Sequence, residues 1–340
     1  MKKHINIPYF VPHEGCGHSC VFCSQEKITG KECKTNSNIE EKQQFFDTVE
    51  TTLATVSTDT TTEIAFFGGS FTGIEEPRMI MLLEWAYSFV KSGRVSGIRL
   101  STRPDYINEH KLNILQKYGV TAVELGVQNM NDAVLTASKR GHTADDTRKA
   151  AKLIIDYGFT FGGQMMLGLP LSTADDEVYT AEQIVEMGAD NTRIYPILVL
   201  VGTELHRMRL AVKYEPPAFD ELVDRGAKCL EVFLKGGVKP LRIGLQASDE
   251  INSYREYNPA YGELVWNRLY LCRMINLIES GGITDSVVFT VNSADISKAV
   301  GQKRKNINYL VDKYKFRSVK IISDNTLANG DIIKTATILN

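Results

Sequence analysis

The fold of this chain is decided by a short stretch near its N-terminus, Cys16-Gly-His-Ser-Cys20-Val-Phe22-Cys23. Its three cysteines are separated by three and then by two residues. Thiolates bind iron, and an iron–sulfur cube is normally held by four of them. A cube held by only three cysteines leaves one iron open to a molecule from outside the protein. The stretch therefore predicts a reactive metal centre with Cys16, Cys20 and Cys23 as ligands.

Two other interpretations of these cysteines start from the same residues. A disulfide framework is typical of short chains in an oxidising compartment, whereas this chain has 340 residues and no recognisable signal peptide. A structural zinc site needs a fourth ligand, which His13 or His18 could supply, although no second Cys-x2-Cys pair follows. The other cysteines, Cys33, Cys229 and Cys272, are isolated and fit small buried side chains.

The cysteine spacing resembles the signature of the radical S-adenosylmethionine (radical SAM) enzymes, Cys-x3-Cys-x-aromatic-Cys, with Phe22 in the aromatic position. The resemblance implies a 4Fe-4S cluster on the three cysteines. It also implies that S-adenosylmethionine (SAM) binds the open iron, with Phe22 beside the adenine. An external one-electron donor of the flavodoxin or ferredoxin type is a further implication.

The composition is that of an ordinary globular protein, with 43% apolar and 24% charged residues. The net charge of −2 does not indicate nucleic-acid binding by the chain as a whole, so any basic surface must be local. No apolar run approaches the roughly 18 residues that a membrane-spanning helix needs. Lys2 and Lys3 do not open a secretory signal. We therefore expect a cytoplasmic protein.

Predicted strands and helices alternate over about 240 residues, which is typical of βαβ units and a mostly parallel sheet. We expect strands at 5–11, 63–67, 98–101, 122–126, 159–167, 192–200 and 241–245, with helices at 40–54, 79–90, 109–118, 175–187 and 219–234. Six or seven such units are too few for a closed eight-stranded barrel. The prediction is an α/β fold, a partial (βα)6-type TIM barrel with a small C-terminal α+β module. We place the barrel with its N-terminal Fe–S loop at 1–248, a connecting helical segment at 249–283 and the module at 284–340.

Polar segments follow several of the predicted strands, and in such folds the chemistry lies at the C-terminal ends of the strands. Gly68 and Gly69 let the backbone approach a ligand closely. Glu124 and Gln128 alternate on one strand and so face the same side, and a buried glutamate there needs a partner such as Arg103 or Arg193. Taken alone, each of these segments also fits an ordinary turn or a solvated strand end.

The wider sequence resembles the radical SAM domain of the elongator catalytic subunit over roughly residues 5–246. The matching blocks are Glu63–Gly73, Ser101-Thr-Arg-Pro-Asp-Tyr106, Val123-Glu-Leu-Gly-Val-Gln128, Lys139-Arg-Gly-His-Thr143, Gln164-Met-Met166 and Ile194-Tyr-Pro196. The resemblance implies that the Gly68–Ser70 backbone binds the amino group of SAM, and that Ser101, Thr102 and Arg103 serve its ribose and carboxylate.

From these blocks we predict two sets of site residues. The cofactor-binding set is Phe22, Gly68, Gly69, Ser70, Ser101, Thr102, Arg103, Gln164 and Met166. The catalytic set is Glu124, Gln128, Arg193 and Tyr195. The resemblance implies that the site makes a 5′-deoxyadenosyl radical and uses it to modify RNA, a tRNA or rRNA base.

Two features depart from the elongator pattern. The first two cysteines are closer together here than in that family. About 95 residues follow the matched region, which is too few for a typical acetyltransferase domain. The chain therefore looks like the short bacterial relatives that lack this domain, and acetyl-CoA chemistry is not part of our prediction.

The C-terminal segment is similar to a KH RNA-binding core, in which a Gly-x-x-Gly loop between two helices clamps a nucleic-acid backbone. Gly301 fills the first glycine position, but Arg304 stands at the second. Lys303, Arg304 and Lys305 supply charge for phosphates, so we predict RNA binding through Gly301, Lys303, Arg304 and Lys305. The alternative is a small α/β module with a solvated basic helix.

The leading hypothesis is thus a radical SAM enzyme that acts on RNA. The first alternative is the same enzyme acting on a small molecule, as in the coproporphyrinogen-type relatives. The second, from another class, is a non-enzymatic RNA-binding protein whose cysteines hold structural zinc.

Overall fold

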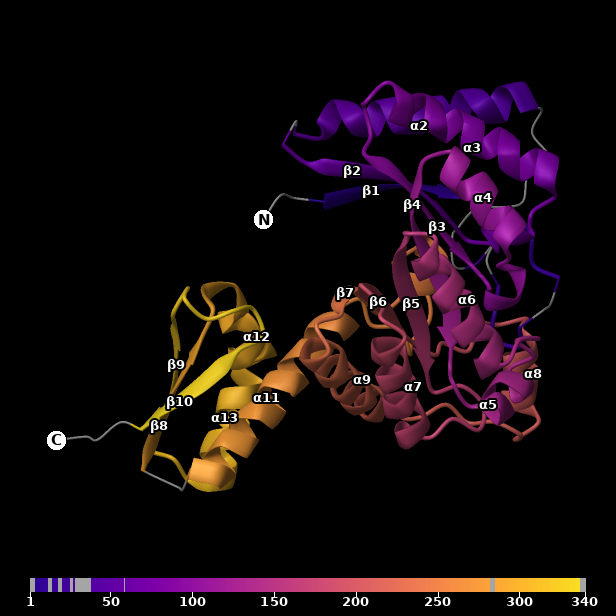
Figure 1. Cartoon of the computed structure of the whole chain (residues 1–340). Coiled ribbons are helices and arrows are strands. Elements are labelled where there is room, and N and C mark those ends of the chain that lie inside the picture. Colours follow the sequence, from indigo (N-terminus) through magenta and orange to yellow (C-terminus); the bar gives the residue numbers. More distant parts are fainter. Residues whose placement is uncertain are drawn as a thin grey trace.

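One curved sheet of seven strands dominates the computed structural model, which describes residues 4–11, 14–17, 20–24, 27, 38–57, 59–281 and 285–336 (Figure 1). The strands lie side by side in chain order, and each pairs in parallel with the next. They are β1 (His4–Phe10), β2 (Thr61–Phe67), β3 (Gly97–Thr102), β4 (Val120–Gln128), β5 (Thr160–Leu167), β6 (Asn191–Pro196) and β7 (Lys239–Ile243). This order confirms the predicted α/β partial TIM barrel. His13, His18 and Cys33 lie outside the described residues.

Helices between the strands cover the outer face of this half-barrel (Figure 1). They are α2 (Asn38–Thr55), α3 (Glu76–Lys91), α4 (Glu109–Lys117), α6 (Ala144–Asp156), α7 (Ala174–Glu186) and α9 (Phe219–Lys235). Three shorter helices lie in the segments that follow β4, β6 and β7, namely α5 (Asp132–Ala137), α8 (Glu204–Leu210) and α10 (Asp249–Asn252). Consecutive residues such as Val123 and Glu124 are both buried, because helices cover the outer face of the sheet and side chains fill the space on its inner face. In the described parts of the chain, no helix is both long and apolar enough to cross a membrane.

Strand β6 is shorter than the sequence predicts, because it ends at Pro196 and not at Leu200. Residues 197–200 are Ile-Leu-Val-Leu, and all four are buried. A buried apolar run of this kind is typical of a strand. In the structure, however, these four residues lie outside the sheet. Leu198 and Leu200 instead pack with Ile251 and line a cavity at the C-terminal edge of the half-barrel.

A second sheet of three strands follows, with the order β10-β8-β9 (Figure 1). Its strands are β8 (Ser286–Val291), β9 (Ser318–Ser323) and β10 (Ile332–Ala336). β8 pairs in parallel with β9 and antiparallel with β10. Helices α12 (Ile296–Val300) and α13 (Lys305–Tyr314) contribute to its core. The five residues of β10 carry too weak a pattern for a strand to be predicted there from the sequence.

Helix α11 (Tyr261–Gly281) joins the two sheets. Val265 and Leu269 near its start belong to the core of the half-barrel. Tyr270 and Met274 further along belong to the core of the small sheet. One helix therefore serves both cores, and the domain boundaries at 248 and 284 stay predictions.

Candidate functional site

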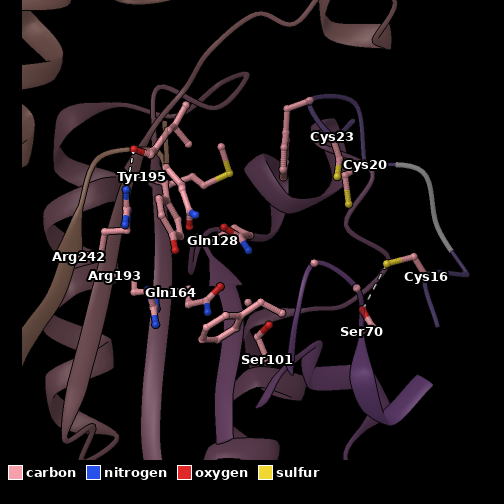
Figure 2. A pocket seen from close by; sticks show the side chains of 18 of the residues that line it. Cys16, Cys20, Cys23, Ser70, Ser101, Gln128, Gln164, Arg193, Tyr195 and Arg242 are labelled. Atoms are coloured by element: carbon pink, nitrogen blue, oxygen red, sulfur yellow. Dashed lines mark hydrogen bonds between the residues drawn. The ribbon is translucent and has the colours of Figure 1, made fainter. Parts of the chain in front are cut away.

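A cavity of about 540 Å³ opens at the C-terminal edge of the half-barrel, between the strand ends and the loop that carries the cysteines (Figure 2). Most residues singled out from the sequence line it together: Cys16, Cys20, Phe22, Cys23, Gly68, Gly69, Ser70, Ser101, Thr102, Arg103, Gln128, Gln164, Met166, Arg193 and Tyr195. Glu124 does not line the cavity, and the residues of the basic loop after α12 lie on the small module.

The cysteine loop, which follows β1, packs tightly against the loop that follows β2. Ser70 donates a backbone hydrogen bond to Glu14 O at 3.0 Å, and its Oγ lies 3.5 Å from Cys16 Sγ. Gly15 has a φ of +72°, and a Cβ there would lie 2.1 Å from Ser70 O. A Cβ at Gly69 would lie 2.3 Å from Glu14 O. Glycine is required at both positions because the two backbones are almost in contact.

Arg140 holds the other end of the cysteine loop, a role that sequence reasoning missed. Its Nη1 donates to Cys20 Sγ at 3.1 Å and its Nη2 donates to Gly126 O at 2.8 Å. The side chain is buried, and it lines the same cavity. The string Lys139-Arg-Gly-His-Thr143 marked this region, but nothing in the string shows that the chain folds back to Cys20.

The wall of the cavity that Cys16, Cys20 and Cys23 form, called the cysteine wall, fits a 4Fe-4S cluster. Burial, with the neighbouring Cys20 and Cys16 sulfurs, raises the pKa of the Cys23 thiol to about 12. A bound metal centre would reverse this shift, because a coordinating thiol is deprotonated outright. Three thiols, of which Cys20 contacts the Arg140 guanidinium, line the open volume and supply the ligands that such a cluster takes. Among the described side chains, no three of His, Cys, Asp or Glu converge to hold a single metal ion.

The end of β3 supplies hydroxyl groups to the cavity floor. Thr102 Oγ1 lies 2.6 Å from Thr72 Oγ1, so the two hydroxyls share a hydrogen bond. Arg103, predicted to bind a carboxylate, makes a bidentate ion pair with Asp105 at 3.0 and 2.9 Å and donates to Arg140 O. Its charge is therefore already matched within the protein. Ser101 lines the cavity, and within the described structure its hydroxyl has no hydrogen-bond partner.

Gln128 reaches the cavity through an irregular strand end. The pairing of β4 with β5 shifts register between Gly126 and Gln128, and Gln128 has a φ of 63°. Its Oε1 is buried and has no hydrogen-bond partner among the described residues. A non-glycine residue in the left-handed region costs roughly 1–3 kcal/mol and is concentrated at functional sites. The bulge thus brings Gln128, with its unsatisfied amide oxygen, to the lining of the cavity.

Glu124 lies beneath the cavity and organises its floor. The carboxylate is fully buried and accepts hydrogen bonds from Arg193 at 2.6 and 3.2 Å, from Gln164 at 2.8 Å and from Arg99 at 3.2 Å. Burial opposes ionisation, but these cations, Arg193 foremost, hold the pKa of Glu124 below its usual range. Glu124 was predicted as catalytic and has the contacts of a positioning residue for Arg193 and Gln164.

The far wall of the cavity carries two arginines and a tyrosine (Figure 2). The Arg193 guanidinium lies 4.9 Å from the centre of the Phe67 ring and forms an ion pair with Glu124. Burial raises the pKa of the neighbouring Tyr195, which is therefore a neutral hydrogen-bonding group at ordinary pH. Arg242 on β7 was not predicted from the sequence, since a lone arginine on a short strand carries no distinguishing pattern.

The basic loop, defined as Gly301–Lys305, lies between α12 and α13 on the small module. Gly301 has a φ of +76°, and a Cβ there would meet Asn306 at 2.8 Å. Lys303 and Arg304 also have positive φ values, of 53° and 61°. Their side chains and that of Lys305 are exposed. None of the three forms a salt bridge with another described residue, so the loop presents unpaired cations to solvent.

Two family models match the chain. The model described as the radical SAM superfamily matches residues 10–184, just over half of the chain, and a radical SAM C-terminal domain model matches residues 189–270. Together these matches cover strands β2 to β7 of the half-barrel and reach into α11. The non-enzymatic alternative is therefore set aside, because the matched superfamily is one of enzymes.

Relatives are found among archaeal and eukaryotic proteins, so a bacterial origin stays a prediction. A tRNA uridine(34) acetyltransferase of Methanocaldococcus jannaschii is 37% identical over 134 residues, 38% of this chain and 25% of that protein. An uncharacterised protein of the same organism is 28% identical over 215 residues, 61% of this chain and 64% of that protein. The chain thus spans about a quarter of the length of the first relative.

A solved structure with the same fold is that of the archaeal Methanocaldococcus infernus Elp3, with a TM-score of 0.63 and 23% identity. The likeness covers 81% of this chain and 64% of the other. These similarities agree with the resemblance to the elongator catalytic subunit seen in the sequence. Membership in the matched superfamily implies a 4Fe-4S cluster and SAM as cofactors. On its matched half-barrel, its cysteine-lined cavity and these relatives, the chain belongs to the radical SAM superfamily.

Proposed function

We propose that this radical SAM enzyme cleaves SAM reductively and uses the resulting radical to modify an RNA base. The single observation that supports it best is the shared cavity. Cys16, Cys20 and Cys23 line one wall, and the glycine, hydroxyl and amide groups predicted to hold SAM line the adjoining floor. The proposal places the reaction in the remaining open volume.

When bound, the cluster supplies the electron that splits SAM into methionine and a 5′-deoxyadenosyl radical, which abstracts hydrogen from the substrate. The protein's own groups bind and orient. The backbone at Gly68 and Gly69 lies next to Ser70 and can accept hydrogen bonds from the amino group of SAM. Ser101 offers a hydroxyl to the ribose, and Phe22 offers an apolar face to the adenine. Arg140 donates to Cys20 Sγ and so steadies the loop that holds the cluster.

RNA is the proposed substrate for two reasons. Two relatives, which match 38% and 56% of this chain, carry the name tRNA uridine(34) acetyltransferase. The basic loop on the small module leaves three cations exposed and unpaired among the described residues, which suits contacts with phosphates. The electron would come from an external donor of the flavodoxin or ferredoxin type.

The test is reductive cleavage of SAM by the anaerobically reconstituted chain with dithionite. We expect wild type to release 5′-deoxyadenosine, and Cys20→Ala to release at least a hundredfold less. Cys272→Ala is the matched control, because Cys272 is an exposed cysteine that does not line the cavity. Release by Cys20→Ala at the rate of Cys272→Ala would show that the reaction does not use this site.

A further inference from the structure

Arg242 stands at the end of the cavity that lies across from the cysteines (Figure 2). It belongs to β7, the last strand of the half-barrel, whereas the cysteine loop follows β1, the first. The two groups therefore rise from opposite edges of the seven-stranded sheet. A ligand held at the cysteines would leave the Arg242 wall to another molecule.

The guanidinium of Arg242 is oriented but has no counter-charge. Its Nε donates to Gly244 O at 3.0 Å and its Nη2 donates to Leu245 O at 3.1 Å. These two carbonyls fix the plane of the group and leave Nη1 without a protein acceptor in the described structure. No carboxylate of a described residue forms a salt bridge with it.

The other cavity arginines differ in this respect. Arg193 is neutralised by Glu124 and Arg103 by Asp105. Arg140 faces the Cys20 sulfur, so a thiolate-bound cluster would supply its negative charge. Arg242 alone among these four lacks any anionic partner in the described structure. A planar guanidinium held in this way suits a carboxylate or a phosphate, each of which it can bind through parallel N–H donors.

SAM itself carries one carboxylate, but the connectivity of SAM keeps that group away from Arg242. The amino and carboxylate groups of its methionine part are bonded to the same carbon atom. With the amino group at Gly68–Ser70, the carboxylate stays on the cysteine side. We propose that Arg242, with Tyr195 on the same wall of the cavity, forms a subsite for an anionic group, phosphate or carboxylate, of the second substrate. This inference rests on the proposed function, because that function places SAM at the cysteine wall.

The test is protection of Arg242 from the arginine reagent phenylglyoxal in the cluster-loaded full chain. The rate of modification of each arginine is followed by peptide mass spectrometry, with SAM, inorganic phosphate or acetate added separately. Arg94 is the internal reference, because it lies on the surface in an ion pair with Glu50. We expect phosphate or acetate to slow modification of Arg242 at least threefold relative to Arg94, and SAM alone to leave it within 1.5-fold.

The pattern of protection also identifies the anion. Protection by phosphate alone assigns a phosphate group, and protection by acetate alone assigns a carboxylate. Protection by SAM alone to the same extent, or by neither small anion, would overturn the proposal. A chain that protects Arg242 with phosphate and yet fails to cleave SAM would refute the proposed function while leaving the anion subsite intact.

Discussion

The interior of the half-barrel and the basic loop of the small module treat charge in opposite ways. Inside, Glu124 is fully buried and contacts two arginines and an amide. On the loop, Lys303 and Lys305 are exposed and have no salt-bridge partner among the described residues. Water can solvate an exposed cation from any direction, so exposed cations are tolerated without protein partners. A buried charge without a partner is strongly destabilising. The charges inside the half-barrel are therefore compensated before any ligand binds, whereas the charges of the basic loop are left to solvent or to a ligand.

Removal of the buried Glu124 carboxylate tests the pairing of charges inside the half-barrel and has the largest expected effect. Glu124→Gln leaves Arg193 without a carboxylate partner and Arg99 with Glu63 alone, so we expect a loss of about 3–5 kcal/mol in the free energy of unfolding, measured by urea denaturation. The control is Glu50→Gln, which breaks an exposed ion pair with Arg94 and should leave the free energy of unfolding nearly unchanged. Equal costs for the two variants would show that burial does not distinguish these ion pairs.

Two glycines with the same backbone conformation test the packing of the cysteine loop. Gly15 and Gly93 both have a φ of +72°, but a Cβ at Gly15 would collide with Ser70 O, whereas one at Gly93 would meet nothing within 4 Å. Either substitution by alanine costs about 1–2 kcal/mol of backbone strain. We expect Gly15→Ala in addition to lower the iron content of the reconstituted chain at least threefold, and Gly93→Ala to leave it unchanged. Equal iron contents would argue against a role for this contact in placing Cys16.

The buried histidine behind Arg140 makes the interior sensitive to pH. Burial, with the charge of Arg140 and despite Asp105, lowers the pKa of His142 to about 3. The unfolded chain binds a proton there near pH 6.5 and the folded chain does not, so stability is lost as the pH falls below 6.5.

At pH 5 the loss due to His142 amounts to about 2 kcal/mol relative to pH 7. We expect His142→Gln to reduce the difference in unfolding free energy between pH 7 and pH 5 by about that amount, measured on the metal-free chain. An unchanged difference would mean that His142 is protonated in the folded protein.

Substitutions in the basic loop have the smallest expected effect, because its exposed cations act only on a bound ligand. Lys303→Glu/Lys305→Glu should weaken the binding of in vitro transcribed tRNA about tenfold and lessen its salt dependence, measured by filter binding at two salt concentrations. Lys149→Glu/Lys152→Glu makes the same change of charge on α6 and is the control. Equal weakening by both double variants would show that tRNA binding depends on the overall charge of the chain and not on the basic loop.

The sequence predicts the half-barrel because strands buried by helices carry long apolar runs that alternate with amphipathic helices. Most cavity residues are predicted from the blocks that resemble the elongator family, and they lie together because the C-terminal ends of parallel strands meet at one edge. The sequence does not predict Arg140, whose contact with Cys20 spans 120 residues of chain. The bulge before Gln128 and the departure of residues 197–200 from the sheet are also missed, since tertiary packing decides both.

The central claim is that the cysteine-lined cavity holds a 4Fe-4S cluster that SAM contacts. The most direct measurement is the metal content and the electron paramagnetic resonance spectrum of the dithionite-reduced, anaerobically reconstituted chain, recorded with and without SAM. We expect about four iron and four sulfide ions per chain and a reduced-cluster signal that changes when SAM is added. Bound zinc without iron, or a cluster signal that SAM leaves unchanged, would contradict it.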